Sequence, residues 1–218
     1  MTKCFVKYML LICCYFVFSF FIASAPITKQ PDFEADVIFV IDSSYDVKQD
    51  DYKAEKEFIK SLVRDLELST NSSRAAFITY GDRSSIASRF VRLKDLATFD
   101  VSVDNASYIG GTRRIDRALQ AVARLLEETR RDTPKLVILL TAGNQTSGVG
   151  SLGAAVDSVK QFGAKTFVVA IGEKPDVQKL KPLVGSPDDI VTAVSFKDLK
   201  SQSTGIANHI GETAGEKN

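Results

Sequence analysis

Hydrophobic residues along the chain form short unbroken runs separated by longer segments of mixed character. The runs are rich in Val, Ile, Leu and Phe, a composition typical of strands buried on both faces of a sheet. They lie at residues 37–41, 75–80, 86–93, 136–140, 166–171 and 190–194. The run at 86–93 is the most polar, so we expect it at an edge of the sheet.

The segments between these runs have apolar residues three and four positions apart, which is the period of an amphipathic helix. The first, at 50–68, places Phe58, Ile59 and Leu62 on one face, with Lys and Glu residues on the other. Further helices are predicted at 115–126, 152–162, 177–184 and 199–210. Strands that alternate with helices indicate a doubly wound α/β fold, mostly parallel, with helices on both faces and one short antiparallel edge strand.

The first 25 residues have a different pattern. Lys3 and Lys7 precede an apolar run at 8–22, which ends in the small residues 23–25. That order is typical of a secretory signal peptide. The alternative is an uncleaved signal anchor, the only case in which we expect membrane association. We therefore predict a signal peptide at 1–24, a strap at 25–34, a folded domain at 35–213 and a tail at 214–218.

Composition narrows the possible chemistry. The chain has 218 residues, with 28 Lys and Arg against 27 Asp and Glu, one His and three Cys. All three cysteines lie in the leader, which excludes disulfides, thiol zinc sites and cysteine nucleophiles from the rest of the chain. Near-zero net charge gives no reason to expect a nucleic acid partner. Three possible glycosylation sites support secretion as a glycoprotein: Asn71, Asn105 and Asn144.

Ligands of doubly wound sheets bind at the carboxyl ends of the strands. The loops expected there are 42–46, 81–85, 110–114, 141–153 and 172–176. The first loop carries Asp42, Ser44 and Asp46, whose oxygens suit Mg²⁺ or Mn²⁺. Asp and Ser are also the commonest residues of turns and helix caps, so the local pattern alone does not distinguish a metal site from an ordinary turn.

Five segments, in order along the chain, resemble the von Willebrand factor type A domain. They are Ala35–Ser44, Tyr108–Leu119, Pro134–Gly143, Lys165–Gly172 and Asp189–Leu199. The resemblance implies the fold predicted above and a metal-ion-dependent adhesion site that begins D-x-S-x-S. In that family, the acidic side chain of a protein ligand completes the coordination of the metal.

The resemblance implies that Asp42, Ser44, Asp46 and Thr112 hold Mg²⁺ or Mn²⁺. Asp46 stands where the family has its second Ser, and Ala142 stands where the family has a further Asp ligand. The departure at Ala142 removes a carboxylate, and the departure at Asp46 adds one elsewhere. The predicted site is therefore a degenerate form of the family's metal site.

Arginines next to the predicted site permit another arrangement. Arg113 and Arg114 could pair with Asp46 or Asp116 and neutralise the pocket without metal. Together with nearby arginines, they are otherwise interpreted as part of a solvated charged face; the six positions are 113, 114, 117, 124, 130 and 131.

A G-x-G-x-x-G run at 148–153 has the form of a dinucleotide-binding fingerprint. Its first glycine comes too late after the preceding strand for the required tight turn, so we interpret the run as a glycine-rich helix start.

The sequence thus predicts a secreted, non-enzymatic adhesion module that binds extracellular matrix proteins, such as collagen-like proteins, at the loop rim around the predicted metal site. No small-molecule cofactor is expected. Two alternatives stay open: a metal-independent structural matrix component that assembles with itself, and a secreted Mg²⁺-dependent hydrolase. The hydrolase lacks a candidate general base beyond Asp46.

Overall fold

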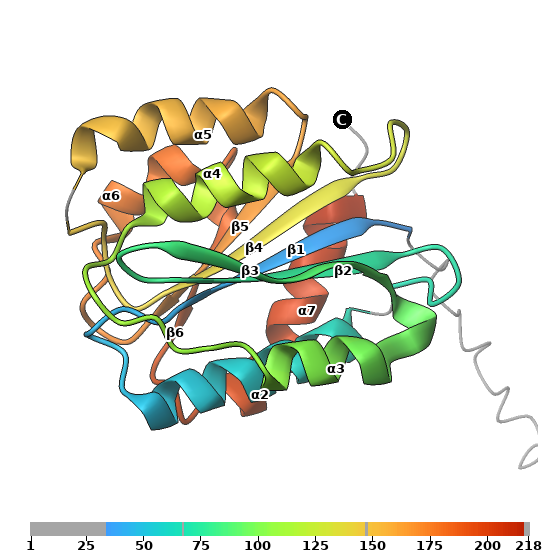
Figure 1. Cartoon of the computed structure of the whole chain (residues 1–218), viewed down its shortest axis with the longest axis horizontal. Coiled ribbons are helices and arrows are strands. Elements are labelled where there is room, and N and C mark those ends of the chain that lie inside the picture. The colour runs from blue at the N-terminus through green and yellow to red at the C-terminus, as the bar shows by residue number, and fades with distance from the viewer. Residues whose placement is uncertain (1–33, 67, 147, 216–218) are drawn as a thin grey trace, which may run out of the picture. The chain divides into compact units, whose positions relative to one another are not determined.

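The computed structural model describes residues 34–66, 68–146 and 148–215, which belong to one compact unit (Figure 1). Six strands form one sheet in the order β3-β2-β1-β4-β5-β6. They are β1 (Asp36–Asp42), β2 (Arg74–Tyr80), β3 (Ser84–Arg92), β4 (Lys135–Thr141), β5 (Lys165–Ile171) and β6 (Ile190–Ala193). All neighbouring strands are parallel except β2 and β3. The predicted doubly wound fold and its antiparallel edge strand are confirmed, although β3 extends over nine residues.

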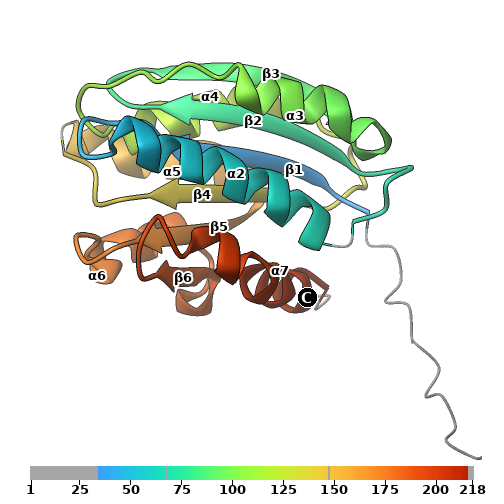
Figure 2. The same ribbon diagram turned by 90° about the horizontal axis from the view of Figure 1, so that it is seen from below.

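Helices cover both faces of the sheet (Figures 1 and 2). One face packs against α2 (Gln49–Asp65), α3 (Leu96–Asp104) and α7 (Leu199–Gly215); the other packs against α4 (Ile115–Leu126), α5 (Leu152–Lys160) and α6 (Val177–Leu180). Short 3₁₀ turns lie at Leu93–Asp95, Val149–Ser151, Lys181–Leu183 and Pro187–Asp189. The arrangement explains why the central strands are hydrophobic on both sides.

Helix α3 has no counterpart among the sequence predictions. It is short and contains Val, Thr, Ser and Asp, which are weak helix formers. Its start is fixed by Asp95, whose carboxylate accepts a hydrogen bond from the Thr98 backbone N–H at 3.3 Å. Phe99 and Val103, four residues apart, are buried against the sheet. Tertiary packing therefore stabilises this helix more than its intrinsic propensity does.

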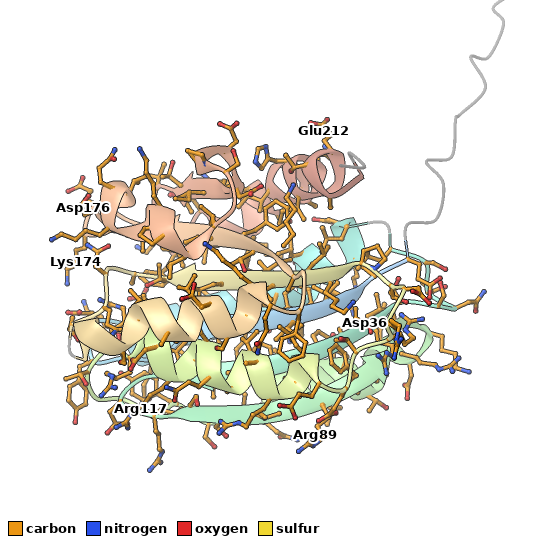
Figure 3. All side chains as sticks on the ribbon, turned by 90° about the horizontal axis from the view of Figure 1, so that it is seen from above. Asp36, Arg89, Arg117, Lys174, Asp176 and Glu212 are labelled. Carbon is orange, nitrogen blue, oxygen red and sulfur yellow. The ribbon has the colours of Figure 1, made fainter. Side chains whose placement is uncertain are left out.

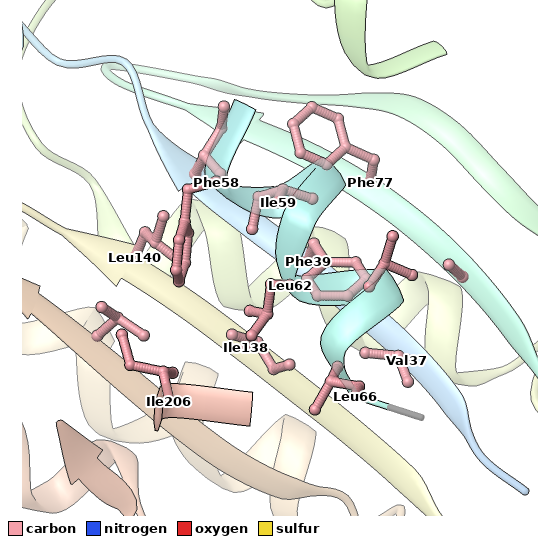
Figure 4. Packing of buried hydrophobic residues seen from close by; sticks show 14 of the residues in the cluster. Val37, Phe39, Phe58, Ile59, Leu62, Leu66, Phe77, Ile138, Leu140 and Ile206 are labelled. Atoms are coloured by element: carbon pink, nitrogen blue, oxygen red, sulfur yellow. The ribbon is translucent and has the colours of Figure 1, made fainter. Parts of the chain in front are cut away.

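The core lies in two layers because successive side chains of a strand point to opposite faces of the sheet. On β1, Phe39 packs in the layer beneath α2, whereas Ile38 and Val40 pack in the layer beneath α4. Figure 4 shows Phe39 with Ile59 and Leu62 of α2 in the first layer. Each such side chain contributes roughly 1.5–3 kcal/mol when fully buried.

Sheet topology places the loops that matter for function. Strand order reverses between β1 and β4, which lie side by side in the middle of the sheet. The loops that follow the parallel strands therefore gather at one edge, the carboxyl edge. At the other end of the chain, α7 runs to Gly215, past the expected residue 210.

The predicted signal peptide at 1–24 lies outside the described residues. So do residues 25–33 of the strap and 216–218 of the tail. Among the helices that the structure does describe, none has both the length and the apolar character needed to cross a bilayer.

Candidate functional site

Three of the loops predicted to carry the site are joined by backbone hydrogen bonds at the carboxyl edge. Gly110 N–H donates to Ser43 C=O at 2.7 Å, and Tyr45 N–H donates to Gly111 C=O at 2.9 Å. Arg114 N–H donates to Gly81 C=O at 3.0 Å. We call these loops, together with those at 142–146 and 172–176, the loop rim. The backbone contacts fix the positions of its side chains relative to one another.

Asp42, the last residue of β1, is the centre of the rim. Its side chain has no exposed surface. One carboxylate oxygen accepts a hydrogen bond from the Ser44 N–H at 2.9 Å, and the other accepts one from the Ala142 N–H at 3.1 Å. The second oxygen also accepts a 2.5 Å hydrogen bond from Nε of Arg113. The carboxylate is thus held by two backbone groups and one guanidinium.

Arg113 is buried with Asp42, since only 2% of its side chain is exposed. Its guanidinium also contacts the Asp46 carboxylate at 3.2 Å and the Asn144 carbonyl oxygen at 3.4 Å. Burial lowers the pKa of Arg113, but the charges of Asp42 and other neighbours outweigh it and raise that pKa. A solvated face was predicted for this arginine, and that prediction is wrong for Arg113.

Asp46 lies at the surface of the rim, where 43% of its side chain is exposed. One carboxylate oxygen contacts Arg113, and the other accepts a hydrogen bond from Nζ of Lys174 at 3.2 Å. The hydrogen bond from Lys174 and the charge of Arg113 lower the pKa of Asp46, against a smaller opposing effect of burial. The two aspartates, together with Arg113 and Lys174, therefore form one cluster in which the negative and positive charges are equal in number.

The other two predicted ligands are placed differently. Ser44 is 1% exposed, and its hydroxyl has no hydrogen-bond partner among the described residues. Thr112 is exposed and precedes the buried Arg113. Arg113 brings Asp42 and Asp46 together, while Ser44 is tied to Asp42 through its backbone. Assignment of these residues as metal ligands stays a prediction.

Arg114 forms a second ion pair beside the first. Its guanidinium binds Asp116 in a fork, with hydrogen bonds of 2.8 and 2.6 Å. Ser151 also donates to the Asp116 carboxylate. The pairing of Arg113 with Asp46 and of Arg114 with Asp116, foreseen as an alternative to metal, is present in the structure. Arg114 also packs against Gly148, where the glycine-rich run begins the turn that leads into α5.

With this geometry established, comparison with known proteins identifies the family. Residues 36–205 match the sequence model of the von Willebrand factor type A domain. This chain belongs to that family. Solved structures agree in fold: proximal thread matrix protein 1 from the mussel byssus superposes with a TM-score of 0.75 at 19% identity, over 83% of this chain and 49% of that one. A form of the same protein is described as having a zinc-occupied MIDAS motif.

The related sequences include several collagen chains. The human collagen alpha-6(VI) chain is 27% identical over an alignment of 213 residues that covers 93% of this chain. The human collagen alpha-5(VI) chain is 27% identical over an alignment of 178 residues that covers 77% of this chain. This von Willebrand factor type A domain spans only 9% and 6% of those two relatives. The chain is thus related to one module of much longer proteins.

The donor set of this von Willebrand factor type A domain does not fit a divalent cation as it is arranged. Both oxygens of Asp42 already accept hydrogen bonds, and the guanidinium of Arg113 lies against both rim carboxylates. Ala142 contributes a backbone N–H, which is a donor and not a ligand. Within the ranges described, no three acidic, imidazole or thiol side chains gather to hold an ion. A cation would therefore have to compete with an arginine already bound.

Beneath the rim lies Glu55 of α2, which the sequence prediction placed on the polar face of its helix. That prediction is wrong, because Glu55 is fully buried and neither of its carboxylate oxygens has a hydrogen-bond partner in the described structure. Burial raises its pKa well above the ordinary value, and the nearby charge of Asp42 raises it further. The spacing of Glu55 along the helix indicates its burial, because it shares one helical face with Tyr52, Ile59 and Leu62. Burial without a hydrogen-bond partner therefore favours the protonated form of Glu55.

The three predicted glycosylation sites differ in exposure. Asn71 and Asn105 are exposed, as an acceptor must be, whereas Asn144 is partly buried in the rim and its carbonyl contacts Arg113. Glycosylation stays a prediction at all three. The structure favours Asn71 and Asn105.

Proposed function

We propose that this chain is a secreted, non-enzymatic module that binds an extracellular matrix protein at the loop rim, and that it does so without a divalent cation. The observation that carries the proposal is a rim of converging loops whose charged centre is already neutralised by Arg113. The leader-like first 24 residues and the sequence relationship to collagen VI chains support the matrix setting.

The surface of the rim suits a protein partner. Tyr45 is 80% exposed and projects from the loop after β1. Aromatic residues of this kind are common anchors in protein interfaces. Exposed charges of both signs lie at the same end of the molecule, among them Arg117, Lys174 and Asp176 (Figure 3). An exposed aromatic side chain at an end of the molecule that also carries charges of both signs favours a polar protein surface as the partner.

Divalent metal is not part of this proposal. The family mechanism needs an open cation that accepts the acidic side chain of the partner. Here Arg113 lies between the two rim carboxylates and is itself almost fully buried, so it offers a partner no open position. Recognition would instead use the exposed side chains around it.

The same contacts weigh against the hydrolase alternative. A general base works best with a pKa near the working pH. Asp46, the candidate base, is bound to both Lys174 and Arg113, and these contacts lower its pKa. A carboxylate stabilised in this way is a poor proton acceptor, which supports a binding role.

Binding to immobilised matrix proteins, including triple-helical collagens, tests the proposal. The protein is purified from the medium of secreting cells and assayed in chelator and in Mn²⁺. We expect binding to at least one matrix protein, equal in the two conditions, and a loss of roughly tenfold or more in affinity for Tyr45→Ala.

Val101→Ala is the matched control, because Val101 is another exposed apolar residue, 58% exposed, but lies on α3 outside the rim. It should bind as the wild type does. Retention of the protein inside the cell would contradict secretion. Binding that Val101→Ala weakens and Tyr45→Ala does not would contradict the rim as the interface. Self-association in place of binding would favour the structural alternative.

A further inference from the structure

The two acidic side chains at the rim require a positive charge. Asp42 has no exposed surface, and a buried carboxylate without a partner is strongly unfavourable. Arg113 supplies the charge from 71 residues away in the sequence, with contacts of 2.5 Å to Asp42 and 3.2 Å to Asp46. One guanidinium therefore bridges both acids.

The surrounding loop is shaped for this guanidinium. A Cβ atom added at Gly143 would lie 2.5 Å from NH1 of Arg113, so any larger residue there would displace the arginine. The Arg113 backbone N–H also donates to the Thr146 hydroxyl at 2.9 Å. The loop after β4 thus encloses Arg113 at both its backbone and its side chain.

An unsatisfied hydroxyl lies in the same loop as the two acids. The Ser44 Oγ is buried and has no hydrogen-bond partner among the described residues, which is rare for a buried polar atom. Arg113 donates to carboxylates and a carbonyl but leaves this hydroxyl unused. Two carboxylates and a hydroxyl are hard oxygen donors, the kind that Mg²⁺ and Mn²⁺ prefer.

We infer that Arg113 is a built-in cation that takes the place of a divalent metal at the rim, and that its removal exposes a latent metal site formed by Asp42, Ser44 and Asp46. An arginine stays charged at every physiological pH. The rim of the wild-type protein is therefore compensated whatever the concentration of metal around it. This inference is independent of partner binding, since its test needs no partner.

Titration with Mn²⁺ tests the inference. Chelator-treated protein is titrated while free Mn²⁺ is followed by electron paramagnetic resonance, and the thermal midpoint is measured in parallel. We expect no specific Mn²⁺ binding by the wild type. Arg113→Ala should have a lower midpoint, bind one Mn²⁺ per chain and recover roughly 5 °C or more at Mn²⁺ well above its Kd.

Arg114→Ala is the matched control, because Arg114 also pairs with a buried aspartate, Asp116, but does not bridge two acids. It should lose stability and gain none from Mn²⁺. Asp42→Asn combined with Arg113→Ala should abolish the recovery, which locates the ion.

Two further variants guard against an Arg113→Ala protein that does not fold. Arg113→Gln keeps a hydrogen-bond donor for Asp42 without the charge, and Gly143→Ala displaces the guanidinium without removing it. Folded Arg113 variants that do not bind Mn²⁺ would overturn the inference. Wild-type protein that binds one Mn²⁺ dependent on Asp42 would overturn it equally, whatever the variants do.

Discussion

Strand β1 has a buried aspartate at each end, and the two are neutralised differently. Asp36, at the amino end, is bound by Arg74 at 3.0 and 2.5 Å and by Arg130 at 3.2 and 2.6 Å. Asp42, at the carboxyl end, has one arginine, which it shares with Asp46. Figure 3 shows Asp36 at the opposite end of the sheet from Lys174, which binds Asp46.

The comparison teaches that a buried aspartate at a strand end is not in itself a sign of metal. Asp36 is paired with two arginines whose side chains are 22% and 34% exposed. If one of them is lost, the other still gives Asp36 a positive partner. Asp42 depends on one arginine that is buried with it. The aspartate at the amino end is thus neutralised by two arginines, whereas Asp42 at the rim relies on Arg113.

The largest expected effect follows from this difference. Arg113→Ala leaves Asp42 buried without a positive partner and should lower the free energy of unfolding by about 3–5 kcal/mol. Arg74→Ala leaves Arg130 on Asp36 and should lower it by only about 1–2 kcal/mol. Urea denaturation in chelator measures both. Equal losses would show that the two ends are not different in the way described.

The rim also depends on close backbone packing, which the next pair of variants examines. A Cβ at Gly81 would lie 2.0 Å from the carbonyl oxygen of Gly110, so Gly81→Ala must move one loop. We expect a loss of about 1–3 kcal/mol. Gly205→Ala, at an exposed position of helix α7 with nothing near its Cβ, should instead gain about 0.5–1 kcal/mol. Chemical denaturation measures the change in the free energy of unfolding for both variants. A Gly81→Ala protein as stable as the wild type would mean that the loops are not tightly joined.

Acid should weaken the amino end in a defined range. Burial raises the pKa of Asp36, but hydrogen bonds from Arg74 and Arg130 outweigh it and lower that pKa below the ordinary value. A lowered folded-state pKa gives stability that is present above the unfolded-state pKa, about 3.9, and is lost as the pH falls through the folded value. Asp36→Asn should therefore be less stable than the wild type at pH 7, with a difference that shrinks below about pH 3.9. A difference that stays constant to pH 2 would contradict the ion-pair explanation.

The smallest effect is expected at the outer part of the rim. Lys174 is 69% exposed and, among the described residues, its ammonium group pairs with Asp46 alone, so Lys174→Ala should cost less than about 1 kcal/mol, and less still in high salt. A larger loss in thermal or urea unfolding would mean that Asp46 relies on Lys174 more than on Arg113.

Much of this arrangement could be predicted from the sequence, because hydrophobic period and loop position are local properties. The buried runs gave the strands, and loops at their carboxyl ends gave the rim with Asp42 in it. Burial of Arg113 was not predictable, since it depends on a contact 71 residues away and on the space beside Gly143. The burial of Glu55 was missed because a single acidic residue is ordinarily assigned to the polar face of a helix, although the apolar face itself was correctly placed.

The most direct test of the central claim is a crystal structure of the wild-type protein grown in millimolar Mn²⁺, with anomalous diffraction data. We predict no anomalous peak at the rim and a guanidinium of Arg113 within hydrogen-bond distance of Asp42 and Asp46. A manganese peak beside Asp42 and Ser44, with Arg113 turned away, would contradict the claim that this arginine is the resident cation of the rim.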